Sequence, residues 1–393
     1  MNILMVHCRY RISGGEDRVV AGDIRLLREM GHRVIPYIMS NSILDGMGTV
    51  SRIKSVAGYL RPLRQRREIV RIAEQNSADV IWVHNTLWIG GTAPYEAGRI
   101  CNIPVIQTVH NFRFLCPNGI CYRQGRICRD CMGSFPYDLH NSILHGCYRH
   151  SRLLSAVIAL NIKKTRKELK QNVKLVCVSE HQRRMLLEHI RGLNPRMVYI
   201  KRNGFGKEGP SRPYGERKNR FIYAGRLTES KGIRELLEAW KSICGEMGEA
   251  APELLICGAG ELSEYTEGYI RDNGLYKVKY AGELPGGEIL ELMADSKALI
   301  YPTRWYEGEP VAITEAYSCA TPVIGTDIGG VSEMISDGIT GRLLSYDDMI
   351  RDIVDAVTGW EDGFSYDADS IRGFSERFSK ESSIRAIKAI IER

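Results

Sequence analysis

Short apolar runs and longer amphipathic stretches alternate along most of the chain. Val20, Ile24, Leu27 and Met30 lie at helical spacing and end at Gly31, which is the pattern of a helix with one buried face. Continuous apolar runs are typical of strands buried on both faces of a parallel sheet. They occupy residues 3–6, 80–83, 105–106 and 175–178 in the first half, and 221–224, 254–257, 298–301 and 323–324 in the second. The alternation predicts an α/β fold with two doubly wound parallel sheets.

The chain has 393 residues, of which 44% are hydrophobic and 26% charged. This is an ordinary globular composition and enough chain for two domains. A boundary is expected between Asn203 and Lys218, where glycines and prolines are frequent and apolar residues are scarce. We therefore expect a first domain over residues 1–205, a second over 206–375 and a terminal helix over 376–393.

Two carboxylates, Glu307 and Glu315, are separated by seven residues, and Pro310 lies between them. Proline suits the first turn of a helix, where a missing N–H costs nothing. With the helix starting there, the two carboxylates lie about 12 Å apart along its axis at about 1.5 Å per residue. The carboxylate pair of a glycosidase lies only about 5–9.5 Å apart. The spacing therefore argues against hydrolysis and suits a longer ligand that one Glu touches at each end.

This segment resembles the E-x7-E motif of retaining GT-B glycosyltransferases, in particular those of family 4 found in bacterial polysaccharide assembly. The resemblance implies two Rossmann-like domains that face a cleft, with the last helix crossing back onto the first domain. It also implies that Glu307 contacts the donor sugar and that Glu315 binds the ribose of the nucleotide. Pro310 and Val311 would line the same donor site.

The stretch from Gly225-Arg226-Leu to Lys231-Gly232 matches the family pattern G-R-L-x-x-x-K-G. The leaving group of such a reaction is a nucleoside diphosphate, so negative charge builds on it in the transition state. A fixed Arg226 and Lys231 directed at that charge would stabilise it. The resemblance therefore implies that no catalytic metal is needed.

Two further parts of the chain match the family. Gly14 and Gly15 precede the first amphipathic helix, where free N–H groups favour a phosphate, and the matching loop of the family borders the donor phosphates. His110 follows the strand-like run at 105–106, and a histidine there lines the catalytic cleft in the family. We expect His110 to orient the donor sugar, although a structural histidine at a strand end is the alternative.

Two glycine-rich stretches follow strand-like runs of the second half. The amides of residues 325–333 would bind the distal phosphate or the sugar, and residues 257–261 would border the base. The sequence departs from the family at the expected hinge, where Asn203-Gly204-Phe-Gly206 replaces the usual Asn-Gly-Val-Asp. Any role of that aspartate is therefore in doubt at Gly206.

Five of the eleven cysteines fall within residues 116–147, in an insertion that we place at about residues 113–150. Cys128 and Cys131 form a C-x2-C pair, with Cys116 and Cys147 as outlying partners. This pattern predicts a structural zinc held by four thiolates, since metal is favoured over disulfide in a cytosolic chain. Free buried thiols and a redox pair are the alternatives.

The formal net charge is +7, and no nucleic-acid motif accompanies it. Basic residues concentrate at 163–170 and in a stretch at 52–71, where apolar residues recur at helical spacing among them. A basic amphipathic helix over 52–71 could lie on an anionic membrane surface, but a solvated helix packed on its own domain fits equally. Because no long apolar run and no signal-peptide pattern is found, we expect a cytoplasmic protein, at most peripheral to the inner face of the membrane.

We therefore interpret the chain as a retaining glycosyltransferase that moves a sugar from a nucleotide diphosphate donor, UDP by family frequency, to a hydroxyl of a glycan or lipid-linked acceptor. One alternative is another GT-B activity, such as a sugar-nucleotide epimerase or a phosphorylase. The other is a zinc-bearing scaffold without catalytic activity, against which the two Glu and the Arg–Lys pair both argue.

Overall fold

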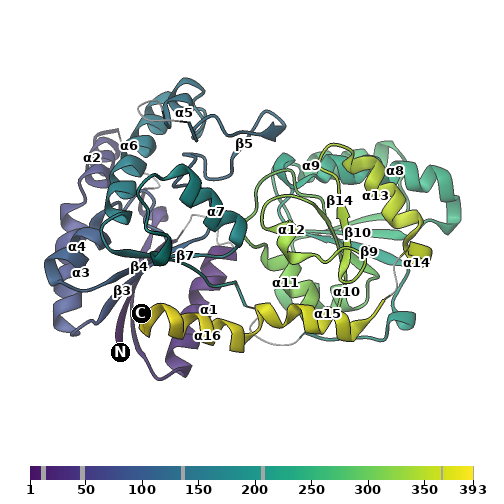
Figure 1. The fold of residues 1–393 in the computed structure, drawn as a ribbon. Helices are drawn as coiled ribbons and strands as arrows, with labels where there is room; N and C mark the ends of the chain where they lie inside the picture. Colours follow the sequence, from purple (N-terminus) through teal and green to yellow (C-terminus); the bar gives the residue numbers. More distant parts are fainter. Residues whose placement is uncertain (10–14, 45–48, 134–137, 205–208, 364–365, 393) are drawn as a thin grey trace. The chain divides into compact units, whose positions relative to one another are not determined.

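The computed structural model describes residues 1–9, 15–44, 49–133, 138–204, 209–363 and 366–392. They divide into two compact units (Figure 1). The first unit comprises Met1–Cys121, Cys128–Lys201 and Ile384–Arg393, and the second comprises Tyr122–Ile127 and Arg202–Ser383. Each unit is built on one six-stranded sheet in which all strands run parallel.

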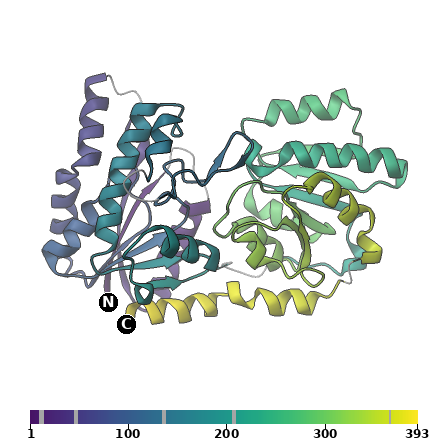
Figure 2. The same ribbon diagram turned by 45° about the horizontal axis from the view of Figure 1, so that its top comes forward.

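The first sheet has the strand order β2-β1-β3-β4-β7-β8. Its strands are β1 (Asn2–Arg9), β2 (Arg33–Ser40), β3 (Val80–Val83), β4 (Val105–Val109), β7 (Val173–Cys177) and β8 (Val198–Ile200). Its helices are α1 (Gly15–Glu29), α2 (Thr49–Leu60), α3 (Leu63–Gln75), α4 (Ala93–Cys101), α5 (His140–Leu144), α6 (Arg152–Leu169) and α7 (Glu180–His189). Figure 2 shows α2 and α6 side by side.

The second sheet has the strand order β11-β10-β9-β12-β13-β14. Its strands are β9 (Arg220–Ala224), β10 (Glu253–Cys257), β11 (Val278–Gly282), β12 (Ala298–Tyr301), β13 (Val323–Thr326) and β14 (Gly341–Leu344). Its helices are α8 (Ile233–Met247), α9 (Ser263–Asp272), α10 (Gly286–Ala294), α11 (Val311–Ser318), α12 (Val331–Met334), α13 (Met349–Thr358), α14 (Trp360–Gly363) and α15 (Ala368–Ser375). A short antiparallel hairpin, β5 (Tyr122–Arg123) with β6 (Arg126–Ile127), also belongs to this unit.

Successive side chains of β9 show why its apolar run is continuous. Phe221 and Tyr223 pack with α8 and α13 on one face of the sheet. Ile222 and Ala224 pack with α10, α11 and α12 on the other face. Because side chains alternate between the two faces of a strand, a sheet covered on both sides needs apolar residues at every position. The predicted α/β fold with two parallel sheets is therefore confirmed.

The last helix, α16 (Lys380–Glu392), begins in the second unit and ends in the first. Ile387 and Ile390 are fully buried in the same cluster as Leu27 of α1 and Trp82 of β3. The Lys174 ammonium also donates a hydrogen bond of 2.7 Å to the Ile390 carbonyl. The final turns of the chain thus complete one face of the first core.

The predicted basic helix over residues 52–71 is two helices, α2 and α3. Proline has no N–H for a helical hydrogen bond, and Pro62 stands between the two as the N-cap of α3. Val56 and Leu60 pack against the buried cluster around Tyr59 and Ile158, so this part of the apolar stripe faces the core. No helix in the described part of the chain is long and apolar enough to cross a membrane.

Candidate functional site

A buried ion pair joins the two sequence motifs of the second unit. The Lys231 ammonium contacts the Glu307 carboxylate, and the two side chains are only 11% and 13% exposed. Tyr301, at the end of β12, accepts a hydrogen bond of 2.7 Å from Lys231 and donates one of 2.9 Å to Glu307. The Trp305 indole N–H also donates to Glu307. The carboxylate of the second motif therefore fixes the position of the cation of the first.

Gly232 allows this close approach. Its φ is +71°, and a Cβ at this position would lie 1.8 Å from the Pro302 carbonyl oxygen. The loop that follows β9 can therefore rest directly on the loop that follows β12. The same contact is tied by a hydrogen bond of 2.9 Å from the Arg304 N–H to the Ser230 carbonyl. Lys231 is thus positioned by backbone contacts on both of its sides.

Several neighbours change the pKa of Lys231 in opposite directions. Burial lowers the pKa of its ammonium, Glu307 raises it, and the nearby Arg226 charge lowers it, with a net lowering. Arg226 is exposed, and its guanidinium makes no hydrogen bond or ion pair within the described part of the chain. Lysine has three N–H donors, of which Tyr301 and Glu307 take two. Two adjacent cations with spare donors are suited to binding an anion.

The helix predicted after Glu307 is present as α11, with Pro310 as its N-cap and Val311 as its first residue. Glu315 is the fifth residue of α11 and is half-buried. Its neighbours Thr314 and Ala316 are buried, so the helix is fixed against its own core. The two carboxylates of the motif therefore occupy different elements, as their spacing indicates.

The glycine-rich loop after β13 packs on the Glu307 backbone. The Gly330 N–H donates a hydrogen bond of 2.9 Å to the Glu307 carbonyl. A Cβ at Gly330 would lie 1.7 Å from the Gly308 carbonyl oxygen, so a larger residue would push the two loops apart. The three motifs of the second unit thus meet at the carboxyl ends of β9, β12 and β13.

Glu309 is a charged residue of this segment that the sequence analysis missed. It is 6% exposed, and its carboxylate accepts hydrogen bonds from the Asn203 N–H and from Arg202, the latter at 3.2 Å. Arg202 also bonds Glu333 at 3.1 Å. Glu309 therefore anchors the start of the second unit. Gly206, where the family usually has aspartate, lies outside the described residues.

In the first unit, His110 belongs to a group of three histidines that follow or end strands of the sheet. The nearest ring nitrogens of His84 and His110 lie 2.8 Å apart, and His7 bonds Asp17 at 2.9 Å. Burial lowers the pKa of His84 and His110 well below the ordinary value of histidine, so both rings are neutral at pH 7. Since neither spacing nor motif links these residues, sequence reasoning found only His110.

Of the two glycines predicted to border the donor phosphates, only one is among the described residues. Gly15 is the first residue of α1, and Gly14 lies outside the described residues. Glu16 and Asp17 lie in the first turn of that helix, where the positive end of the helix dipole stabilises their negative charges.

The four predicted cysteine ligands are all reduced, with Cys116 and Cys131 buried and Cys128 and Cys147 partly exposed. The Cys121 thiol and nearby backbone amides donate to the Cys116 sulfur, and these bonds lower the pKa of Cys116 to about 6. Within the described ranges, no three or more His, Cys, Asp or Glu side chains are arranged as a metal cluster.

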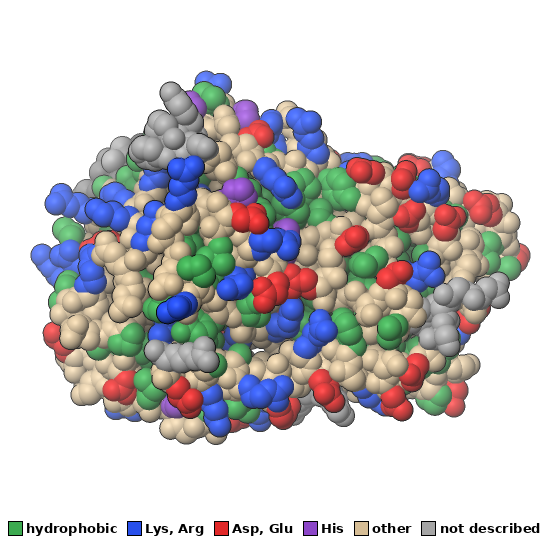
Figure 3. Space-filling view, in the orientation of Figure 1, with side chains coloured by type: hydrophobic (Ala, Val, Ile, Leu, Met, Phe, Trp, Pro, Cys, Tyr) green, Lys and Arg blue, Asp and Glu red, His purple; other side chains and the backbone are tan. Residues whose placement is uncertain are grey.

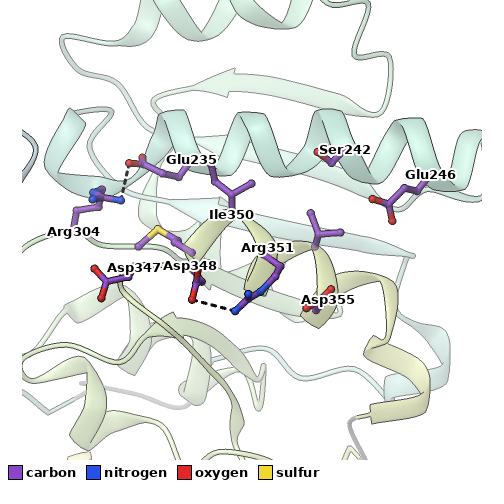
Figure 4. A pocket seen from close by; sticks show the side chains of 11 residues that line it. Glu235, Ser242, Glu246, Arg304, Asp347, Asp348, Ile350, Arg351 and Asp355 are labelled. Atoms are coloured by element: carbon purple, nitrogen blue, oxygen red, sulfur yellow. Dashed lines mark ion pairs between the residues drawn. The ribbon is translucent and has the colours of Figure 1, made fainter.

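An open groove of about 640 Å³ runs along α8 and α13 (Figure 4). Its lining includes Glu235, Glu246, Asp347, Asp348 and Asp355 but only two arginines. Both arginines are already paired with carboxylates of the lining, at 3.0 and 3.1 Å. This groove is therefore too acidic for a diphosphate, and it contains none of the predicted site residues.

Residues 207–368, which hold all three motifs of the second unit, match the family model of glycosyl transferases group 1. Solved structures have the same fold. That of Anabaena HepE in complex with UDP and glucose is 15% identical, with a TM-score of 0.70 over 100% of this chain and 99% of its own. The second unit is thus similar to the group 1 glycosyl transferases, and the chain has the GT-B fold.

Two further proteins are similar to this chain. The apo structure of the lipopolysaccharide outer core galactosyltransferase WaaB is 16% identical, with a TM-score of 0.65 over 100% of this chain and 99% of its own. The alpha-maltose-1-phosphate synthase of Mycobacterium tuberculosis is 25% identical over 303 residues, 71% of this chain and 66% of that protein. The chain thus spans slightly less than two thirds of that relative's length.

Replacing Glu307 by Gln tests the ion pair, because it keeps a hydrogen-bond acceptor but removes the charge. We expect the variant to lose about 3 kcal/mol of stability at pH 7, since breaking a buried pair leaves an unpaired charge. Without Glu307 the pKa of Lys231 falls further below its unfolded value. The unfolded state then binds more protons, and stability rises with pH. The difference in free energy of unfolding between the wild type and the variant should therefore become smaller as the pH is raised from 7 towards 10.

The measurement is the urea unfolding midpoint of the wild type and Glu307→Gln across this pH range. Glu229→Gln, an exposed position two residues before Lys231, is the matched control and should leave the midpoint unchanged. A deficit that stays constant with pH would contradict the role assigned to the charge.

Proposed function

We propose that this enzyme is a retaining glycosyltransferase that transfers a sugar from a UDP-sugar to a hydroxyl of a glycan or lipid-linked acceptor. The observation that carries the proposal is the convergence of Arg226, Lys231 and Glu307 at the carboxyl ends of the second sheet. In open α/β sheets, ligands bind outside the carboxyl ends of the strands. A carboxylate that holds a cation beside a second, exposed cation suits a donor with a diphosphate next to a sugar.

Each residue has a part in the proposed reaction. Lys231 and Arg226 bind the diphosphate and stabilise the charge that develops as the sugar leaves, in place of a divalent metal. Glu307 holds the donor sugar, and Glu315 the ribose, with Pro310 and Val311 lining the site. Gly14, Gly15 and His110 belong to the first unit, and their part in donor binding rests on the family resemblance.

Retention of configuration is part of the proposal because the motifs resemble those of retaining GT-B glycosyltransferases. No side chain is placed by the sequence as a nucleophile for a double displacement. Attack of the acceptor on the face from which the diphosphate leaves would retain the configuration, with the β-phosphate taking the acceptor proton. The structures of HepE with UDP and glucose and with UDP-glucose support a UDP-sugar as donor.

We expect Lys231→Ala to lower kcat by about a hundredfold or more, the scale of losing one charge-stabilising donor. Turnover would be followed as UDP release from UDP-glucose, UDP-galactose and UDP-N-acetylglucosamine, with a membrane extract of the source organism as acceptor. Lys241→Ala, at an exposed position of α8, is the control. Unchanged turnover in Lys231→Ala would contradict the role of Lys231, and an inverted anomeric centre in the product, read by NMR, would contradict retention.

Membrane contact, at the inner face of the cell membrane, is a further part of the proposal. Helix α6 exposes Leu153 and Leu160, 75% and 52% exposed, in line with exposed Lys163 and Lys164. Lys and Arg side chains are frequent on the face of the first unit shown in Figure 3. An amphipathic helix of this kind favours an anionic lipid surface.

Co-sedimentation with vesicles tests this contact. The protein should bind vesicles that contain phosphatidylglycerol and not those of phosphatidylcholine alone. The double substitution of Leu153 and Leu160 by Ser should release it, whereas Ile339→Ser, at an exposed apolar position of the second unit, should not. Equal binding of all three proteins would rule out α6 as the contact.

A further inference from the structure

We propose that Cys116, Cys128, Cys131 and Cys147 bind one structural zinc ion that folds the segment between β4 and α6. The inference is independent of the proposed transfer reaction. It rests on how the backbone brings four cysteines from three separate turns to one place, and on what surrounds their sulfur atoms.

Cys131 lies at the centre of the group. Its thiol interacts electrostatically with those of Cys116, Cys147 and Cys128, and it accepts a hydrogen bond from the Ser142 N–H. The Ser142 carbonyl in turn accepts a hydrogen bond of 3.0 Å from the Cys147 N–H. The backbone of one fully buried serine therefore holds two of the four cysteines beside each other.

The turn at Cys116 is built to hold a negatively charged sulfur. The chain reverses at Gly119, whose φ is +85° and whose N–H donates a hydrogen bond of 2.7 Å to the Cys116 carbonyl. The N–H groups of Asn118, Gly119 and Cys121 lie close to the Cys116 sulfur. Amide donors of this kind stabilise a thiolate, which is the form that binds metal.

The hairpin β5–β6 brings Cys128 back to this turn. The Cys128 N–H donates a hydrogen bond of 2.8 Å to the Cys121 carbonyl, so the two residues face each other across the base of the hairpin. The next four residues form a turn, in which the Met132 N–H donates a hydrogen bond of 2.9 Å to the Arg129 carbonyl. Cys128 therefore directly precedes this turn and Cys131 lies within it, with the C-x2-C spacing of structural zinc sites.

The surroundings also provide a counter-charge. Zinc with four thiolates carries a net charge of −2. Arg166 of α6 is 8% exposed and interacts electrostatically with Cys131. Its guanidinium is fixed by hydrogen bonds of 2.6 Å to the Phe114 carbonyl and 2.5 Å to Asp138. Asp138 is paired with this arginine, but the buried guanidinium still lies near the thiols and attracts their negative charge.

The sulfur atoms are not yet arranged as a finished metal cluster in the described part of the chain. Cysteine has one side-chain torsion with three staggered positions, so each sulfur can change its direction on an unchanged backbone. Cys121 is the fifth cysteine, and its thiol is committed as a donor to Cys116. It therefore acts as a neighbour of the site and not as a ligand.

The first test is the metal content of the wild-type protein, purified without chelators and without a polyhistidine tag. Elemental analysis should find about one zinc per chain, and titration with p-hydroxymercuribenzoate should release it, as followed with a metallochromic indicator. After exchange, Co²⁺ should show the absorption bands of a tetrahedral site with four thiolates. A metal-free protein that takes up no Co²⁺ would overturn the proposal and leave free thiols or a redox pair.

Variants then test the ligand set. Cys131→Ser and Cys147→Ser should each lose the tetrahedral four-thiolate cobalt spectrum. Cys121→Ser, which keeps a hydroxyl donor to Cys116, and Cys101→Ser, outside the insertion, should keep both the zinc and the spectrum. Should a ligand variant fail to fold, the mercurial titration of the wild type still decides the question. Loss of the metal in Cys121→Ser with retention in Cys147→Ser would overturn this ligand set.

Discussion

The buried contact between Lys231 and Glu307 is the constraint on which the candidate site depends. Removing two charges from water costs several kcal/mol per ion, and the cost is offset only when the pair has good geometry and further hydrogen bonds. Tyr301 and Trp305 supply those bonds. The pair therefore forces two segments 76 residues apart in the chain to adopt one arrangement, and the glycines at 232 and 330 are the positions that make it sterically feasible.

The ion pair also sets the net charge of the candidate site. One carboxylate neutralises one ammonium, and the exposed Arg226 adds a charge that this pair does not neutralise. A diphosphate would therefore meet a net positive field next to a carboxylate that can hold a sugar hydroxyl. The groove along α8 and α13 has the opposite character, because it is lined mainly by carboxylates. The two places therefore differ in the sign of their charge.

The fold could be predicted where burial is uniform. The eight strands predicted from apolar runs are the central strands of the two sheets, four in each sheet. The strands of these sheets that were not predicted lie at the sheet edges, and they are β2, β8, β11 and β14. An edge strand is covered less completely, so its sequence is mixed, as in β11, where buried and exposed positions vary. The Lys231 and Glu307 motifs were visible because the spacing of their residues matches the patterns of the family that the sequence resembles. The role of Glu309 was not predicted, because its partners Arg202 and Asn203 lie about 100 residues away in the chain and no sequence pattern links them.

The most direct test of the central claim is calorimetric titration of the wild type and Lys231→Ala with UDP and with GDP. The account predicts that UDP binds the wild type, that GDP binds more weakly, and that UDP affinity falls at least tenfold in Lys231→Ala, about 1.4 kcal/mol. Equal UDP affinity in the two proteins, or no binding of UDP to the wild type, would contradict the assignment of the Lys231–Glu307 pair to the donor site.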